Sequence, residues 1–201
     1  MGVEKVFVQS GFAEVYRCVL FITSQVVSVN NVSYKPVAVS PIGNVSPVAS
    51  KLNEVVEALN TSLFPFKAEV AVDAIIWKKA IVNSVFNSVC PLLNIDNGIF
   101  LRNAAAMVIA KRVIKECVGI AQAKGITLTD EEVTDSLLLI SRLSNGQFIS
   151  TLQDINNKRR TEIDTLNFQI VEIAKTLNKE DSVQETRLLG ELVKIKSQLN
   201  I

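Results

Sequence analysis

The chain has 201 residues, of which 48% are hydrophobic and 20% are charged, and its formal net charge is +1. This composition is typical of one large or two small globular domains. A net charge near zero gives no electrostatic footprint for nucleic acid, and no apolar run reaches the roughly 18 residues of a membrane span. The N-terminus lacks the pattern of a secretory signal. We therefore expect a cytoplasmic protein that binds neither nucleic acid nor a membrane.

Metal and histidine chemistry are not expected. The chain contains no histidine, and its three cysteines (Cys18, Cys90 and Cys117) form an odd set without CxxC spacing. Neither a typical zinc site nor a disulfide framework fits this pattern.

The first 73 residues predict mixed α/β structure. β-branched and aromatic residues favour a strand over residues 17–29, and a second short strand is expected over 36–42, before a turn at Gly43. Residues 67–72 alternate briefly and predict another strand.

A helix is expected between these strands. Ser46 followed by Pro47 is typical of a helix start, with an N-cap and a proline at the first helical position. Apolar residues then recur at helical spacing as far as Leu63, and Pro65 is expected to end the helix.

From residue 74 onward the periodicity predicts helices almost throughout, so the predicted fold class is α+β and predominantly α. The first helix is expected to break or bend at Pro91. Gly125 fits the left-handed position after a helix end, and Thr129 with Glu132 matches a capping box. Further helices are expected over 102–124, from 129 to a stop at 145–146, over 162–178 and from 181 onward, with a polar segment over 150–160.

The stretch 77–97 carries the most informative pattern. Lys79, Asn83 and Asn87 fall at i, i+4 and i+8, so they form a polar stripe on a helix that is apolar over much of its remaining surface. Burying an amine and two carboxamides is costly unless they find partners, and a polar ligand is one such partner. A solvated stripe on an ordinary amphipathic helix explains the same spacing.

Two separated motifs resemble the C-terminal half of ketopantoate reductases (2-dehydropantoate 2-reductases). One is the stretch with Lys79, Asn83 and Asn87, followed by the turn at Asn97 and Gly98. The other is residues 150–164, STLQDINNKRRTEID. Their order and separation are those of the family, and the resemblance extends over nearly the whole chain.

The resemblance implies both a domain organisation and a reaction. Residues 1–73 would be the C-terminal remnant of a Rossmann-type dinucleotide-binding α/β domain, and residues 74–201 an all-helical substrate-binding domain. The implied activity is the NADPH-dependent reduction of a small 2-oxo acid, ketopantoate, to pantoate in pantothenate and coenzyme A biosynthesis.

The resemblance also implies residue roles. Lys79 would be the general acid that protonates the ketone oxygen, and Glu162 would orient the lysine or the substrate hydroxyl. Asn83, Asn87 and Asn97 would hold the substrate or its neighbours, and Ser150 would contact its carboxylate. An ammonium suits this reaction because the ketone oxygen gains negative charge. Each of these residues also has a structural interpretation, as a cap or a turn residue.

The chain departs from the family pattern in its glycines. The family carries a GxGxxG turn on which the pyrophosphate of NADPH sits, and none of the eight glycines here forms that spacing. We expect that most of the cofactor domain is missing and that this chain alone does not bind NADPH; no cofactor-binding residue is assigned. Phe168 and Ser182 stand where the family often has glycine and proline.

Three functions remain open. The chain is the substrate-binding portion of a ketopantoate reductase, inactive without a cofactor half, or a reductase of another 2-oxo acid, or a non-catalytic helical interaction module derived from the family. In each case we expect a homo-oligomer, because a strand within residues 19–29 would lack some of its native neighbours.

Overall fold

The computed structural model describes residues 4–45 and 51–199. Contacts divide the chain into two compact units, one within residues 2–76 and the other within residues 77–201. We call them the N-terminal unit and the helical unit. The boundary falls inside a single helix, α3 (Val72–Leu93). The fold class is α+β and predominantly α, as expected.

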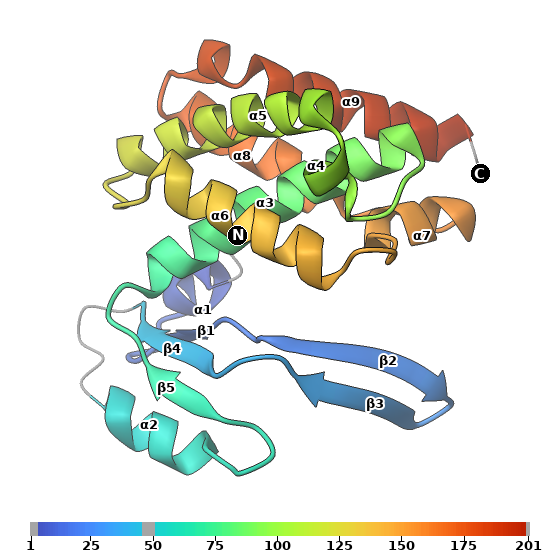
Figure 1. Ribbon diagram of the computed structural model, residues 1–201. Coiled ribbons are helices and arrows are strands. Elements are labelled where there is room, and N and C mark those ends of the chain that lie inside the picture. The colour runs from blue at the N-terminus through green and yellow to red at the C-terminus, as the bar shows by residue number, and fades with distance from the viewer. Residues whose placement is uncertain (1–3, 46–50, 200–201) are drawn as a thin grey trace. The chain divides into compact units, whose positions relative to one another are not determined.

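The N-terminal unit combines a small mixed sheet with a separate hairpin (Figure 1). In the sheet, β4 lies between β1 and β5; it is antiparallel to β1 and parallel to β5. The hairpin is formed by β2 and β3. The elements are α1 (Lys5–Gln9), β1 (Tyr16–Cys18), β2 (Ile22–Ser28), β3 (Asn31–Pro36), β4 (Ser40–Asn44), α2 (Leu52–Leu59) and β5 (Phe66–Ala68).

The strand predicted over residues 17–29 is divided into β1 and β2. The chain leaves the sheet after β1, where the N–H of Val19 bonds to the carbonyl of Pro41 and the N–H of Phe21 bonds to the Ser40 hydroxyl. A turn with Asn30 in the left-handed region (φ 64°) then forms the hairpin. The composition of this stretch correctly predicted extended structure. Its division into two strands, however, depends on pairing with β4.

The second predicted strand, 36–42, was misplaced. Its first residue ends β3, and β4 begins only at Ser40 and runs through Gly43. Gly43 is therefore a strand residue and not a turn. A Cβ at this position would collide with Val72 and with the carbonyl of Glu69, so glycine is needed for close packing.

The predicted helix between the strands is shorter at its C-terminal end than expected. Helix α2 ends at Leu59, and Leu63 is exposed in the following loop. The Asn60 side chain accepts a bond from the N–H of Phe66, which turns the chain into β5. Only residues 67–68 of the predicted strand 67–72 belong to β5, and Val72 already begins α3. The predicted start at Ser46 and Pro47 lies outside the described residues.

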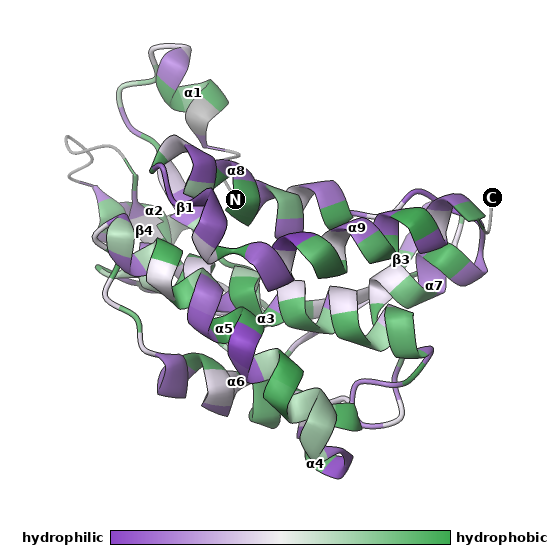
Figure 2. Ribbon diagram, turned by 90° about the horizontal axis from the view of Figure 1, so that it is seen from above, coloured by the Kyte–Doolittle hydropathy of each residue, from purple (hydrophilic) through white to green (hydrophobic). Residues whose placement is uncertain are grey.

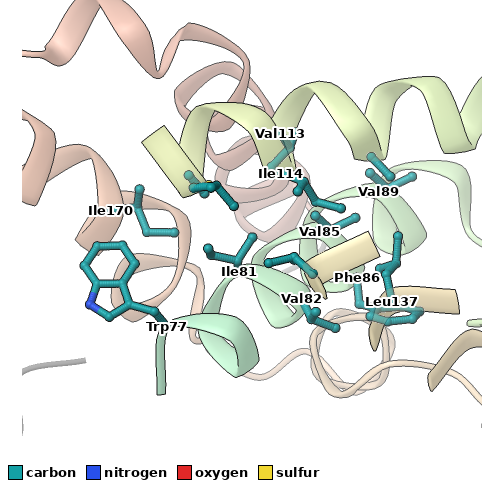
Figure 3. Close-up of a cluster of buried hydrophobic side chains, with 14 of the residues drawn as sticks. Trp77, Ile81, Val82, Val85, Phe86, Val89, Val113, Ile114, Leu137 and Ile170 are labelled. Atoms are coloured by element: carbon teal, nitrogen blue, oxygen red, sulfur yellow. The ribbon is translucent and has the colours of Figure 1, made fainter. Parts of the chain in front are cut away.

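The helical unit is built around α3. The α3 residues Ile81, Val82, Val85 and Phe86 are fully buried and share one core with residues of α5, α6 and α8 (Figure 3). Each such side chain contributes about 1.5–3 kcal/mol through burial. The other elements are α4 (Ile99–Arg102), α5 (Ala104–Ala123), α6 (Asp130–Leu143), α7 (Ser150–Asn156), η1 (Ile163–Thr165), α8 (Asn167–Thr176), η2 (Glu180–Ser182) and α9 (Gln184–Leu199).

Two local start and stop signals were predicted correctly in this unit. Thr129 and Glu132 form both bonds of a capping box at the start of α6. Gly125 has φ 79°, the left-handed conformation that follows a helix end. Pro91 does not break α3, which continues for two residues to Leu93 and stops where Asn94 takes φ 52°.

Three helical predictions need correction. The helix expected from residue 102 begins at Ala104, because the Asn103 side chain caps it by accepting from the N–H of Ala106. The helix expected over 162–178 is divided into η1 and α8 by Leu166. The expected polar segment 150–160 contains helix α7, which buries Leu152 and Ile155. In the described part of the chain, no helix is long and apolar enough to cross a membrane.

Candidate functional site

The polar stripe of α3 becomes more buried along the helix. Lys79 is exposed, Asn83 is half-buried, and Asn87 is only 4% exposed. Successive members are four residues apart, or about 6 Å along the axis. The stripe is therefore neither wholly solvated nor wholly buried. Its Lys79 end is exposed at the surface, and its Asn87 end is part of the protein interior.

Asn87 uses both ends of its amide within the protein. Its Nδ2 donates to the carbonyl of Asn83 at 2.9 Å, and its Oδ1 accepts from the Ser150 hydroxyl and from the N–H of Thr151, both at 3.4 Å. The two longer bonds tie α3 to the first turn of α7. Because a buried amide needs such partners, Asn87 positions Ser150 beside the stripe.

Ser150 is the first residue of α7, and its exposed side chain reaches Asn87. Thr151, which the sequence analysis did not single out, is buried and contributes the neighbouring N–H. The helical spacing of buried Thr151, Leu152 and Ile155 could have revealed α7, but its surrounding polar residues obscured the pattern.

Asn97 belongs to a different set of contacts, the corner between α3 and α4. Its Nδ2 donates to the Ser144 hydroxyl at 3.2 Å, and its backbone carbonyl accepts from the Ser141 hydroxyl at 2.6 Å. The residue is 6% exposed, and its Oδ1 is buried without a hydrogen-bond partner. Asn97 thus joins the corner to α6, and its unpaired oxygen can still accept a bond.

Asp96 and Arg102 stabilise the same corner, and neither was singled out from the sequence. The Asp96 carboxylate binds Arg102 at 2.7 Å and accepts from the N–H groups of Gly98 at 2.8 Å and Gly146 at 3.1 Å. The Arg102 bond and these N–H groups lower the pKa of Asp96 to about 2. In the sequence, the Asp-x-Gly spacing of the turn could have indicated this role of Asp96.

Glu162 lies immediately before η1 and is exposed, and its backbone carbonyl accepts bonds from the N–H and hydroxyl of Thr165. Hydrogen bonds thus join three of the six predicted site residues: Asn83, Asn87 and Ser150. Asn97 is in the α3–α4 corner and Glu162 in the loop after α7.

The buried cysteines do not provide a nucleophile. Burial raises the pKa of both Cys90 and Cys117 to about 12, so each remains a neutral thiol at pH 7. The polar chemistry of the helical unit is therefore that of ammonium, amide, hydroxyl and carboxylate groups.

The described residues do not fit a dinucleotide. A pyrophosphate cradle needs closely spaced glycines between a strand and a helix N-terminus. Of the described glycines, Gly11 and Gly43 lie in the N-terminal unit, and they are 32 residues apart. The described residues therefore provide no binding site for a dinucleotide cofactor.

A protein-family model for the C-terminal part of ketopantoate reductases (PanE/ApbA) matches residues 71–196, which is more than half of the chain. The chain belongs to the ketopantoate reductase family. The resemblance inferred from its two motifs is thereby confirmed.

Curated 2-dehydropantoate 2-reductases also match part of the chain. The 2-dehydropantoate 2-reductase of Pyrococcus horikoshii is 38% identical over 125 residues, which are 61% of this chain and 40% of the relative. That of Streptococcus pyogenes serotype M1 is 37% identical over 93 residues, or 46% of this chain and 30% of the relative. The match thus covers two fifths or less of each relative's length.

Solved structures show the same fold. A D-mandelate dehydrogenase in complex with NADH has a TM-score of 0.88 at 20% identity and covers 100% of this chain and 69% of that one. The 2-dehydropantoate 2-reductase of Methylococcus capsulatus has a TM-score of 0.82 at 16% identity, with coverage of 98% and 63%. A dimeric ketopantoate reductase from Staphylococcus aureus has a TM-score of 0.74 at 17% identity, with coverage of 92% and 63%. At these identities the likeness concerns the fold alone.

Proposed function

We propose that this chain is the substrate-binding portion of an NADPH-dependent reductase that converts ketopantoate to pantoate. One observation carries the proposal: within the family-matched region, α3 presents a stripe that runs from exposed Lys79 to buried Asn87, and Asn87 binds Ser150 of α7. A lysine, an asparagine and a serine are thereby available to a small polar anion from two helices.

In this proposal Lys79 is the general acid. The hydride for the ketone carbon would come from a reduced nicotinamide held by a separate cofactor domain. As the ketone oxygen gains negative charge, the Lys79 ammonium stabilises it and donates the proton. No histidine is required.

The other residues hold the substrate. Asn83 and Ser150 bind its hydroxyl and carboxylate groups, and Asn87 keeps Ser150 in place. Asn97 keeps its structural interpretation, because its buried Oδ1 lies in the α3–α4 corner, and Glu162 orients Lys79 or the substrate. Homo-oligomer formation is also part of the proposal, as in the dimeric enzyme of Staphylococcus aureus.

A non-catalytic interaction module is the second candidate, and it is favoured by the hydrogen bonds that hold Asn87 and Asn97 within the protein. The two candidates differ in ligand binding. A substrate portion binds ketopantoate, whereas an interaction module has no reason to retain that affinity.

The deciding experiment supplies the cofactor domain of a ketopantoate reductase by fusion and follows NADPH oxidation. We expect turnover with ketopantoate, and slower turnover with 2-oxo acids that lack its hydroxyl. Turnover of another 2-oxo acid in preference to ketopantoate would reassign the substrate. A folded fusion that binds NADPH but reduces no 2-oxo acid would favour the interaction module.

A further inference from the structure

The last helix, α9, exposes a regular apolar stripe. Its members are Leu188, Leu192, Ile195 and Leu199, with exposed fractions of 54%, 41%, 51% and 81%. Their spacing of four, three and four residues is that of the a and d positions of a heptad repeat. In Figure 2, hydrophobic and hydrophilic residues alternate along α9.

The stripe is not required by the core of the helical unit. Thr186, Gly190, Val193 and Ser197 are buried and form the opposite face of α9. The helix therefore has two apolar or small-residue faces, one packed within its own unit and the other exposed. Four large apolar side chains in one exposed row are the pattern of an interaction surface and not of scattered surface residues.

The charges beside the stripe indicate which partner it fits. With Leu192 and Leu199 at a positions, Glu191 falls at g and Lys196 at e. In a parallel pair of identical helices, each g residue faces the e residue five positions later on the partner, so Glu191 of one copy faces Lys196 of the other. The Lys196 ammonium is held in position by a bond to the carbonyl of Pro91. Its positive charge still attracts a carboxylate.

We propose that α9 pairs in parallel with α9 of a second copy of this chain, through Leu188, Leu192, Ile195 and Leu199. The seam ends before Leu188, because the preceding a position is Glu185, which is paired with Arg112 at 3.0 Å. Since α9 is already folded on its own unit, pairing does not require the unfavourable nucleation step of an isolated short helix.

The same charges do not fit a lipid surface. A membrane-surface helix carries lysines and arginines beside its apolar face. Here Gln184, Glu191 and Gln198, at g positions, line one side of the stripe, and Leu189 and Lys196, at e positions, line the other. A second copy satisfies this pattern and an anionic membrane does not.

The first test measures the oligomeric state of the whole chain by sedimentation equilibrium. We expect a dimer that Leu192→Lys weakens by at least roughly 10-fold in dissociation constant, because it places two like charges in the seam. Leu143→Lys is the matched control, since Leu143 is 66% exposed on α6 and outside the stripe. A monomer at about 100 µM, or equal effects of the two variants, would overturn the proposal. So would binding to anionic vesicles that Leu192→Lys abolishes.

The second test reports the direction of pairing. In a Cys18→Ser background, which leaves only the buried Cys90 and Cys117, Leu188→Cys should form an intermolecular disulfide under mild oxidation. In a parallel pair the two copies of residue 188 are adjacent, whereas in an antiparallel pair they are roughly 16 Å apart. A disulfide between Leu188→Cys and Leu199→Cys chains, without one between two Leu188→Cys chains, would refute the parallel arrangement.

Discussion

At the scale of single residues, a comparison of Lys79 with its neighbour Lys78 distinguishes a catalytic role from a general effect of positive charge. In an active fusion with a cofactor domain, Lys79→Ala should lower kcat by roughly 10²-fold or more, with a smaller change in KM. The reason is that the oxygen becomes strongly basic only during hydride transfer, so the ammonium acts mainly in the transition state. Lys78 points about 100° away around α3, and Lys78→Ala should retain most activity. Steady-state kinetics of the two variants provides the comparison, and equal losses would contradict the assignment of Lys79.

Asn87 is expected to contribute mainly to the stability of the fold and to the position of α7. Asn87→Ala removes two long bonds to α7 and leaves the N–H of Thr151 without its partner, so it should lower the free energy of unfolding by about 1–2 kcal/mol. Hydrogen exchange should show faster exchange in the first turn of α7. Asn156→Ala changes an exposed asparagine of the same helix and serves as the control. Unchanged exchange in α7 would indicate that Asn87 does not position Ser150.

At the scale of elements, Glu116 of α5 caps the N-terminus of α9. Its carboxylate accepts from the N–H of Glu185 at 2.9 Å and from the N–H and hydroxyl of Thr186 at 2.8 and 2.7 Å. The family often has a proline where this chain has Ser182, and here a carboxylate from another helix satisfies the helix start.

Glu116→Ala should therefore lower the free energy of unfolding by about 2 kcal/mol in urea denaturation. Glu116→Gln keeps one acceptor oxygen and should lose less. If the glutamine variant lost as much as the alanine variant, the carboxylate charge rather than the hydrogen bonds would be the stabilising feature.

The corner between α3 and α4 should make stability depend on acid pH. The pKa of Asp96 is lowered from 3.8 to about 2 in the folded protein, chiefly by Arg102, so its contribution is complete above pH 3.8 and is lost as the pH falls towards 2. Urea denaturation across this range should show a smaller loss of stability for Asp96→Asn than for the unmodified chain. Asp135→Asn, at an exposed position of α6, should follow the unmodified chain. The prediction fails if both variants show the same pH dependence.

At the scale of the whole molecule, the 201-residue chain by itself should not bind NADPH in the low micromolar range, because it has no glycine-rich cradle for the pyrophosphate. Titration followed by nicotinamide fluorescence measures this directly. The fusion with a family cofactor domain is the positive control. Micromolar binding by the chain alone would show that residues other than such a cradle can hold the cofactor.

Local signals predicted much of the fold because they act over a few residues. The capping box at Thr129 and the left-handed glycine at Gly125 depend on backbone geometry within one turn, and both were correct. The division of the predicted strand 17–29 was not predictable, because it depends on pairing with β4, whose residues come 24 to 28 positions after their β1 partners. Helix α7 was missed for the same reason, since its apolar residues are few and their burial depends on other helices.

The candidate site shows the same contrast. The sequence alone determined the family, the helical spacing of Lys79, Asn83 and Asn87, and the residue types suited to protonating a ketone, because these are properties of residue order. Only the tertiary structure decided that the stripe passes from exposed Lys79 to buried Asn87 and that Asn87 meets Ser150, 63 residues later. The tertiary structure also placed Asn97 in the α3–α4 corner, away from the polar stripe, and left the apolar stripe of α9 exposed. Helical spacing defines which residues share a face, but what that face contacts is determined by how distant segments pack.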